Sequence, residues 1–336
     1  MRVPVRTALM CTVAAASLVV CCGASAFCGE SGQTKLTASQ RRTYERFLNL
    51  GRIREFPPTP WPRAYIYESR YYRVRTNTSR DVARYIGILM DSHVEAFKKV
   101  FRFRMTIPKT NIYAYRTRKE FEYYGGKLVG AIVGPNTGGF WTQKRGGTIV
   151  LPYLREGNLD PGKVLLHEAS HQFLHRALNS DRIPTWLDEG LAVFFEESRY
   201  NPITKKLELA YVPRERLRWL QHEMKADRHV SLKELVGTPR EAFTASHYGS
   251  AWSFIYWLMR SADKKEALRR QKALNQYLLD IRAGRTDHRR LFAYLGLSME
   301  MIEGRWRDWV VELDPNKVRG GTYLPGDANA NLLPGH

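Results

Sequence analysis

The sequence predicts an α+β protein in which a small, strand-rich lobe precedes a mainly helical one, with a cleft between them. Residues 71–77 alternate apolar and polar side chains as a strand does, whereas residues 79–101 repeat apolar residues at helical spacing. Residues 110–117 predict another strand, and glycines divide residues 130–153 into short strands. From residue 161 to about residue 313 nearly every segment has the helical period instead. The order of these patterns along the chain gives the two lobes.

Shorter elements complete this order. Residues 39–50 predict a short helix, and the segment PPTPWP at 57–62 predicts a stiff, extended connector. Ser79 stands at the start of the long helical repeat and is placed to cap it, because a serine oxygen there can accept a backbone N–H of the first turn. The segment RKEFEYYG at 118–125 predicts another short helix.

These patterns also divide the chain. The segments are a signal peptide (1–26), an N-terminal helix with its connector (27–62), one folded domain (63–313) and a loose tail rich in glycine, proline and asparagine (314–336). Within the folded domain, residues 63–155 form the mixed α/β lobe and residues 156–313 form the helical lobe. With 336 residues, 43% of them hydrophobic, the chain can bury a substantial core, which argues against disorder throughout.

The first residues have the features of a secretory signal. Arg2 and Arg6 precede the apolar run ALMCTVAAASLVVCC, and the small-x-small triplet Ala24-Ser25-Ala26 follows it. We therefore expect cleavage near Ala26 and export to the periplasm, the cell envelope or the medium. The alternative is an uncleaved membrane anchor, which fits less well because the apolar run is short for a membrane span.

Three of the four cysteines lie in the predicted signal peptide. Cys11, Cys21 and Cys22 lie within it, so the exported chain keeps only Cys28 and has no intramolecular disulfide. A lipid anchor on Cys21 or Cys22 is disfavoured, because Val20 and Cys21 precede them where lipidation sites favour a small residue. Stability must therefore come from the core or from a bound ion.

The chain is strongly basic. Its formal net charge of +20 falls to +18 when the two arginines of the leader, which contains no acidic residue, are subtracted. Such an excess favours anionic partners, for example an acidic envelope polymer or a lipid surface. The cations are scattered along the sequence, and no nucleic-acid-binding motif accompanies them. Nucleic acid is therefore a disfavoured partner.

The segment HEASH at 167–171 is the first feature with specific chemistry. His167 and His171 are four residues apart, so on a helix both rings lie on one face and can bind one ion at about 2.0–2.1 Å. Glu168 would lie beside that ion, where a carboxylate can take a proton from a water that the metal activates. The alternative is an ordinary helix that carries polar residues.

A catalytic zinc needs a third protein ligand, and the segment DRIPTWLDEGLAVFFEE supplies candidates. Residues 179–181 predict a turn and Pro184 suits the first turn of a second helix, so the two helices pack together and bring Glu189 over the histidines. Asp188 is the rival ligand. Neighbouring residues on a helix point about 100° apart, so we expect only one of the two acids to face the histidine pair.

Two further residues lie near this pattern. Glu196 is seven residues after Glu189, on nearly the same helix face, and either bonds a ligand histidine or faces solvent near the helix end. His175 continues the series of His167 and His171, but two turns along it reaches too far to share their ion. We expect His175 not to be a ligand.

HEASH followed by WLDEGLA resembles the gluzincin metallopeptidases, and the layout of the chain is similar to the bacterial peptidase MA-like families. The resemblance covers roughly residues 63–310, with specific motifs in the two zinc helices alone. It implies a zincin-like helical lobe with one Zn²⁺, held by His167, His171 and Glu189, and with Glu168 as general base. The family pattern thus favours Glu189 over Asp188.

The resemblance implies two more features. Gluzincins commonly place a tyrosine or histidine on a later helix as oxyanion donor, which here suggests Tyr248, with His247 as competitor. They also commonly bind substrate as an added strand at the sheet edge. Gly138 and Gly139 in NTGGFWTQ (136–143) would allow that close approach, although a plain glycine hairpin fits equally. The G-x-M-E-N element of the aminopeptidases is absent, which disfavours that activity.

The sequence therefore predicts an exported zinc peptidase that cleaves within peptide or protein chains. A second hypothesis is an envelope-associated binding protein that keeps the fold, and the metal, without turnover. It is motivated by the basic charge and by the uncertain oxyanion donor. A third hypothesis is a hydrolase of non-peptide substrates that uses the same ion.

Overall fold

The described part of the chain begins with a sheet. The computed structural model describes residues 64–101, 107–130, 133–134, 137–143, 147–153, 160–209, 211–261 and 263–315. The strands are β1 (Tyr65–Glu68), β2 (Tyr72–Thr76), β3 (Thr110–Tyr115), β4 (Phe140–Thr142) and β5 (Thr148–Pro152), in the spatial order β1-β2-β3-β5-β4. β2, β3 and β5 run parallel, and the edge strands β1 and β4 pair antiparallel to them.

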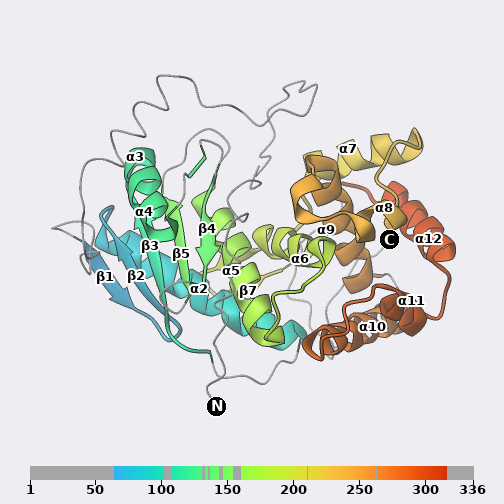
Figure 1. Ribbon diagram of the computed structural model, residues 1–336, viewed down its shortest axis with the longest axis horizontal. Coiled ribbons are helices and arrows are strands. Elements are labelled where there is room, and N and C mark those ends of the chain that lie inside the picture. Colours follow the sequence, from blue (N-terminus) through green and yellow to red (C-terminus); the bar gives the residue numbers. More distant parts are fainter. Residues whose placement is uncertain are drawn as a thin grey trace, which may run out of the picture.

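Helices follow the sheet, so the predicted α+β order is confirmed (Figure 1). They are α2 (Arg80–Phe101), α3 (Arg118–Glu120), η1 (Phe121–Gly125), α4 (Gly126–Val129), α5 (Pro161–Leu178), α6 (Thr185–Glu196), α7 (Arg214–Lys225), α8 (Leu232–Gly237), η3 (Arg240–Ala242), α9 (Ala245–Met259), α10 (Lys264–Arg282), α11 (Arg289–Leu295) and α12 (Met299–Glu312). Figure 1 shows the sheet at one end of the molecule and α7 to α12 towards the other, with α5 and α6 between them.

Two of the local predictions in the sheet region are confirmed. The predicted cap Ser79 accepts a hydrogen bond from the backbone N–H of Val82 at 3.1 Å, at the start of α2. The predicted helix at 118–125 exists and continues to Val129, with a π-helical turn in its middle. Thr117 and Glu120 form a reciprocal capping box at its start, which explains why the helix begins there.

One hairpin departs from the predicted run of helices after residue 161. β6 (Arg199–Asn201) and β7 (Lys206–Glu208) pair antiparallel directly after α6. The Asn201 side chain accepts the backbone N–H groups of Ile203 and Thr204, at 2.9 and 3.1 Å, and so forms the turn. A side chain that bonds its own neighbours in this way competes with helix formation, and the apolar period does not register it.

The helices that carry HEASH and WLDEGLA form a hairpin. Asp160 caps α5 by accepting the N–H of Gly162 at 2.8 Å, and Pro161 occupies the first turn, where no N–H is needed. Asn179 ends α5 in the left-handed conformation, with φ of 48°. After a short connection, Pro184 precedes α6 at its N-cap position. The predicted turn and second helix are thus confirmed.

One continuous core connects the sheet to the last helix. At its centre Phe97 of α2 stacks on Phe195 of α6, with ring centroids 4.3 Å apart, and also contacts Phe173 of α5 at 4.4 Å. His93, on the same helix, lies fully buried between Phe97 and Phe195. Three helices that carry or support the candidate site therefore meet around one aromatic cluster.

Several predictions fall on other parts of the chain. The signal peptide (1–26), the helix at 39–50 and the connector at 57–62 lie outside the described residues, as does the tail from residue 316 onward. No helix among the described residues combines the length and the apolarity that crossing a bilayer requires.

A glycine permits the close contact between α6 and α9. A Cβ atom at Gly190 would lie 2.8 Å from the backbone oxygen of Ala251 and 2.8 Å from the Cγ1 of Ile255. Both neighbouring atoms belong to the packed helix α9, so displacing either of them would cost free energy. Gly190 follows Glu189 directly, and its lack of a side chain therefore sets how near α9 comes to the candidate site.

We expect Gly190→Ala to lower the free energy of unfolding by about 1–3 kcal/mol, because the added methyl group overpacks this crossing. Gly304→Ala in α12 is the matched control. A Cβ there meets nothing within 4 Å, so alanine should raise stability by roughly 0.5–1 kcal/mol through its higher helix propensity. Urea denaturation of both variants measures the difference. Equal stability of Gly190→Ala and the unsubstituted protein would contradict the assigned contact.

His93 makes stability depend on pH. Burial lowers the pKa of His93 from its ordinary 6.5 to about 3. Ser170 donates its hydroxyl to the backbone oxygen of Leu166, so the Nε2–H of His93 donates to the Ser170 oxygen, 3.0 Å away. The Nδ1 of His93 is buried and has no hydrogen-bond partner among the described residues. A proton on Nδ1 would therefore bring an uncompensated charge into the core.

Because the folded state resists this proton, the contribution of His93 is complete above pH 6.5 and is lost as the pH falls towards about 3. The loss amounts to about 1.4 kcal/mol per pH unit. His93→Leu should flatten the pH dependence of the unfolding free energy by this amount, whereas His222→Gln, at an exposed position of α7, should not. Identical slopes for the His93→Leu variant and the unsubstituted protein would refute this assignment.

Candidate metal centre

The two histidines of α5 face each other. Their Nε2 atoms lie 3.2 Å apart, and His167 and His171 are only 2% and 5% exposed. The spacing of four residues places both rings on the helix face that packs against α6. The predicted convergence of the two rings is therefore present in the structure.

Glu189 of α6 completes the group. Its Oε2 lies 3.5 Å from the Nε2 of His167 and 3.6 Å from the Nε2 of His171, and the residue is fully buried. These three donor atoms can hold a metal ion. No other group of at least three histidine, cysteine, aspartate or glutamate residues suitable for a metal is found within the described part of the chain.

The spacing of these residues is compatible with a zinc ion. Ligand bonds of 2.0–2.1 Å in a tetrahedron place donor atoms about 3.3–3.4 Å apart. The three observed separations, 3.2, 3.5 and 3.6 Å, lie around this value. Moreover, the Oε2 of Glu189 is buried and has no hydrogen-bond partner among the described residues. Two nitrogen donors and one carboxylate oxygen are also a ligand set that zinc accepts.

Carboxylates on α6 orient both rings from their outer edges. The Nδ1 of His167 donates to Glu196 at 2.8 Å, and the Nδ1 of His171 donates to Asp188 at 2.8 Å. Each bond keeps the proton on Nδ1 and leaves the lone pair of Nε2 free for a metal. Of the two readings of Glu196, the hydrogen bond to a histidine is therefore correct, and solvent exposure is wrong because the residue is 4% exposed.

Glu189 is the one acid of the two that faces both histidines, as expected, while Asp188 contacts the outer edge of His171. Both carboxylates approach His171, Asp188 at Nδ1 and Glu189 at Nε2. An imidazole ring carries its nitrogens on different edges, so two acids that point about 100° apart can contact the same ring from two sides. Asp188 lies on the outer side, and Glu189 is the acid that reaches the space between the histidines.

Burial and charge oppose each other throughout this cluster. Burial raises the pKa of Asp188, Glu189 and Glu196, but the adjacent histidines and arginines outweigh it and hold each pKa below its ordinary value. Burial likewise opposes the charge on His167 and His171, yet the carboxylates raise the pKa of both rings. The cluster therefore attracts positive charge, which a metal cation can supply in place of the ring protons.

Glu168 lies beside the group, as predicted. It is 2% exposed, and burial is the main reason why its pKa is raised, although His167 and His171 act in the opposite direction. The backbone N–H of Trp141 in β4 donates a hydrogen bond to this carboxylate. Its Oε1 has no hydrogen-bond partner among the described residues. A carboxylate in these surroundings accepts a proton more readily than one in water.

The sequence reasoning missed Arg240. This residue of η3 donates to both Asp188 and Glu189, through separate nitrogens of one guanidinium group. Burial disfavours its charge, but the two carboxylates outweigh burial and raise the pKa of Arg240 above its ordinary value. The residues on either side of it, GTP and EAF, form no motif, and Arg240 lies 51 positions after Glu189. No local signal in the sequence could have identified it.

Tyr248, and not His247, is the α9 residue that reaches the cluster. The Tyr248 hydroxyl forms a hydrogen bond with Glu189. Burial is the main reason why the pKa of Tyr248 is raised, and the negative charge of Glu189 is the second. His247 instead lies in the capping box of α9, where its Nδ1 is 2.8 Å from the Thr244 hydroxyl and its Nε2 is 3.3 Å from the Thr238 hydroxyl. The structure thus separates the two competitors for oxyanion donor.

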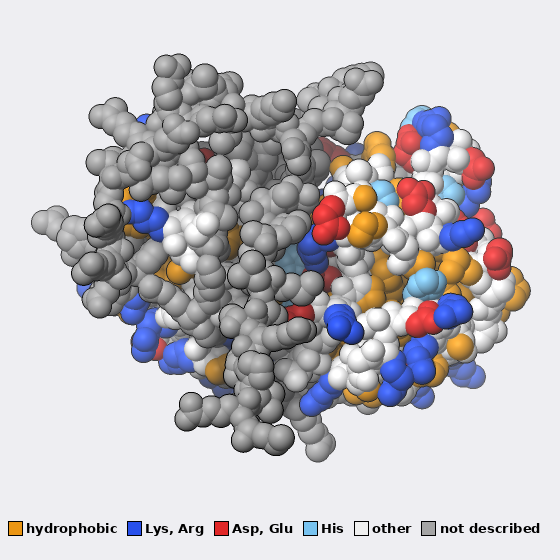
Figure 2. Space-filling view, viewed as in Figure 1, with side chains coloured by type: hydrophobic (Ala, Val, Ile, Leu, Met, Phe, Trp, Pro, Cys, Tyr) orange, Lys and Arg blue, Asp and Glu red, His pale blue; other side chains and the backbone are white. Residues whose placement is uncertain are grey.

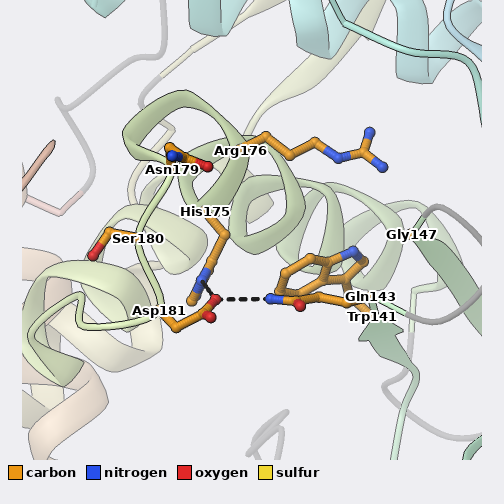
Figure 3. A pocket seen from close by; sticks show the side chains of 8 residues that line it. All are labelled: Trp141, Gln143, Gly147, His175, Arg176, Asn179, Ser180 and Asp181. Atoms are coloured by element: carbon orange, nitrogen blue, oxygen red, sulfur yellow. Dashed lines mark hydrogen bonds and ion pairs between the residues drawn. The ribbon is translucent and has the colours of Figure 1, made fainter. Parts of the chain in front are cut away.

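His175 lies beyond the metal group and borders a polar hollow of about 310 Å³. Its Nε2 is 3.5 Å from Asp188, and its ring packs 5.1 Å from Trp141. Figure 3 shows Gln143 and His175 both directed at Asp181, whose carboxylate accepts from the Gln143 amide at 2.8 Å. This hollow lies between the end of β4 and the α5–α6 turn, where the sheet and the helical region meet.

Gly139, the residue before β4, has a structural use. A Cβ at Gly139 would come within 2.7 Å of Val164 in α5 and within 3.2 Å of Leu151 in β5. In the structure, Gly139 therefore permits a close approach between the edge strand and α5. This packing holds β4, and with it the N–H of Trp141, beside Glu168.

One protein-family model matches a part of the chain. A family model described as "Protein of unknown function (DUF1570)" matches residues 163–276, from the first turn of α5 into α10. The matched segment includes both histidines, Glu189, Arg240 and Tyr248. No curated protein matches the chain. The chemistry of the site therefore rests on its own geometry.

Metal titration tests the roles assigned to these residues. We expect the protein to bind one zinc ion per chain and Glu189→Ala to lose most of this affinity, because a ligand is removed. Asp188→Asn should weaken affinity roughly 10–100-fold, since the ring of His171 is then less firmly held. Competition with a chromophoric chelator measures each affinity.

The control is Asp280→Asn, which changes another buried aspartate bonded to arginines, at the end of α10. It should leave zinc affinity unchanged. If Asp188→Asn and Asp280→Asn affect affinity equally, the hydrogen bond to His171 does not support the metal site. Unchanged affinity in Glu189→Ala would exclude Glu189 as a ligand.

Proposed function

We propose that this protein is an exported zinc metallopeptidase of the gluzincin type, which hydrolyses peptide bonds within a chain. The observation that carries the proposal is the buried set of His167, His171 and Glu189 with Glu168 at its side. Zinc held by these three residues supplies Lewis acidity, which polarises a carbonyl group and lowers the pKa of a water molecule. The remaining chemistry belongs to the protein's own side chains.

Glu168 is suited to the proton transfers. Burial raises its pKa, so its carboxylate accepts a proton from water more readily and can return it to the leaving amine. The Trp141 N–H fixes the carboxylate, and the Oε1 without a partner is available for the proton. Proximity to Glu189 favours the neutral form further. Glu168 thus fits the part of general base and, later, general acid.

Tyr248 is suited to stabilising the charge that develops on the substrate carbonyl oxygen. Its raised pKa keeps the phenol protonated, and a protonated phenol can donate a hydrogen bond to an oxyanion. Its hydroxyl already lies at the cluster, where it bonds to Glu189. Transfer of this hydrogen bond from Glu189 to the oxyanion would favour the transition state over the bound substrate.

Two further features support the proposal: the bond from Arg240 to Glu189, and the position of β4 at the sheet edge. Arg240 holds the Oε1 of Glu189 and so leaves Oε2 as the oxygen that faces the histidines. β4 is the edge strand nearest the site, and an extended peptide can pair with such an edge. The absence of the G-x-M-E-N element in the sequence favours cleavage within a chain over removal of its first residue.

Activity measurements separate the proposed roles. We expect Glu168→Gln to lower kcat for peptide hydrolysis by about 10²–10⁴-fold, because the general base is lost, while zinc content stays the same. Tyr248→Phe should lower kcat by roughly 10²–10³-fold with little change in KM, since the hydroxyl acts on the transition state. A library of quenched fluorescent peptides supplies the substrate.

The matched control is Tyr256→Phe, which removes a buried hydroxyl from the same helix at a position away from the metal group. It should keep near-normal kcat. Cleavage that is undiminished in Glu168→Gln would refute the proposed base. If the unsubstituted protein binds zinc but cleaves no member of the library, the chain is better described as an envelope-associated metal-binding protein without turnover.

A further inference from the structure

The basic charge of the protein is not evenly placed. On the face drawn in Figure 2, Lys and Arg side chains lie among acidic ones over the helical region, so charges of opposite sign are interspersed there. A different arrangement occurs where the β6–β7 hairpin packs against α2. There the two elements enclose a groove of about 490 Å³, and cationic side chains from both line it.

The tip of the hairpin is held firmly and presents an apolar side chain. The Asn201 oxygen accepts two backbone N–H groups of the turn, and its amide donates to Glu208 at 2.6 Å. Ile203 at this tip is 89% exposed, more than any other large hydrophobic residue among the described ones. A turn that is fixed in this way cannot fold Ile203 back onto the protein, so its apolar surface stays available to a partner.

A lysine follows in a conformation that lysine adopts rarely. Lys205 has φ of +54°, in the left-handed region where glycine or asparagine is less costly. Lys205 and Lys206 both line the groove, and neither forms an ion pair with a described residue. The turn therefore directs two uncompensated cations to the same side of the molecule as the groove.

The opposite wall adds more positive charge. Arg70, Lys98 and Lys99 line it, whereas the acidic residues of the groove are Asp91 and Glu95. With the two lysines of the hairpin, the groove therefore has five cationic side chains and two carboxylates.

Both carboxylates already have donors. Asp91 accepts from the Ser69 hydroxyl at 2.8 Å and from the backbone N–H groups of Arg70 and Tyr71, at 2.9 and 3.1 Å. Glu95 accepts from the Tyr71 hydroxyl and from the Arg70 side chain. Arg70 forms an ion pair with Glu95, and the four lysines then outnumber the single remaining carboxylate, so the groove keeps a net positive charge.

The surface between these cations is largely apolar. Tyr71, Ala96, Leu207 and Leu209 contribute to the groove, together with the hydrocarbon stems of the lysines. Lys98 lies over the ring of Tyr71, 4.6 Å from its centroid. The groove thus combines an apolar lining with a cationic rim, and the exposed Ile203 precedes Lys205 by two residues in the same turn.

We propose that the β6–β7 hairpin and the adjoining end of α2 dock the protein onto an anionic lipid bilayer. Ile203 enters the interface between headgroups and acyl chains, and Lys98, Lys99, Lys205 and Lys206 contact lipid phosphates. A soluble acidic polymer would need the cations but would gain nothing from Ile203 or from the apolar lining. The combination of the two therefore favours a lipid surface, and this inference does not depend on the proposed peptidase activity.

The test measures binding of the full chain to vesicles of phosphatidylcholine, with and without phosphatidylglycerol, by co-sedimentation. The variants are Lys205→Gln/Lys206→Gln and Ile203→Ser, and the control is Lys225→Gln/Lys233→Gln, which removes the same charge from α7 and α8. The double hairpin variant should lower the partition coefficient on anionic vesicles roughly 10–30-fold. Ile203→Ser should lower it about 10-fold. The control pair should change it less than about twofold, since these lysines lie away from the contact.

Four results would overturn the proposal. One is an equal loss of binding in the control pair, which would indicate a response to net charge alone. Another is unchanged binding in both hairpin variants, and a third is equal binding to neutral and anionic vesicles. The fourth is tight binding to polyglutamate that needs the lysines but not Ile203, together with weak vesicle binding, which would assign the groove to an acidic polymer. Thermal melting of each variant establishes that the fold is retained.

Discussion

Two hydrogen bonds, from His167 to Glu196 and from His171 to Asp188, are the constraint on which the candidate site depends. They fix each imidazole in one tautomer and turn both Nε2 atoms towards the same small space, where Glu189 adds an oxygen. All three acids come from one helix, α6, and both histidines come from α5. The helical hairpin therefore builds the donor set together with its supports.

Burying so many carboxylates has a cost, which the surrounding structure compensates. Unpaired buried charges are strongly unfavourable, so each acid has a cationic or hydrogen-bonding partner. Arg240 serves Asp188 and Glu189 together, and Tyr248 adds a bond to Glu189. Arg240 comes from η3, just before α9, and Tyr248 comes from the first turn of α9. α9 can approach because residue 190 is glycine. The site thus requires the later helices as well as the hairpin.

The sequence predicted those parts of the molecule that depend on local spacing. The face shared by His167 and His171 follows from a spacing of four residues on one helix, and the bond from Glu196 was foreseen from its place seven residues after Glu189 on the next helix. Arg240 and the N–H of Trp141 were not predictable, because distant segments bring them to the site through tertiary packing. The β6–β7 hairpin was missed since it depends on a side-chain turn at Asn201, which hydrophobic periodicity does not detect.

The most direct test of the central claim is a crystal structure of the zinc-loaded protein with anomalous data at the zinc edge. Our account predicts one peak within about 2.0–2.2 Å of the Nε2 atoms of His167 and His171 and of the Oε2 of Glu189. Asp188 and Glu196 should remain bonded to the outer nitrogens of the rings. A zinc ion ligated by Asp188, or the absence of a peak between the two histidines, would contradict the account.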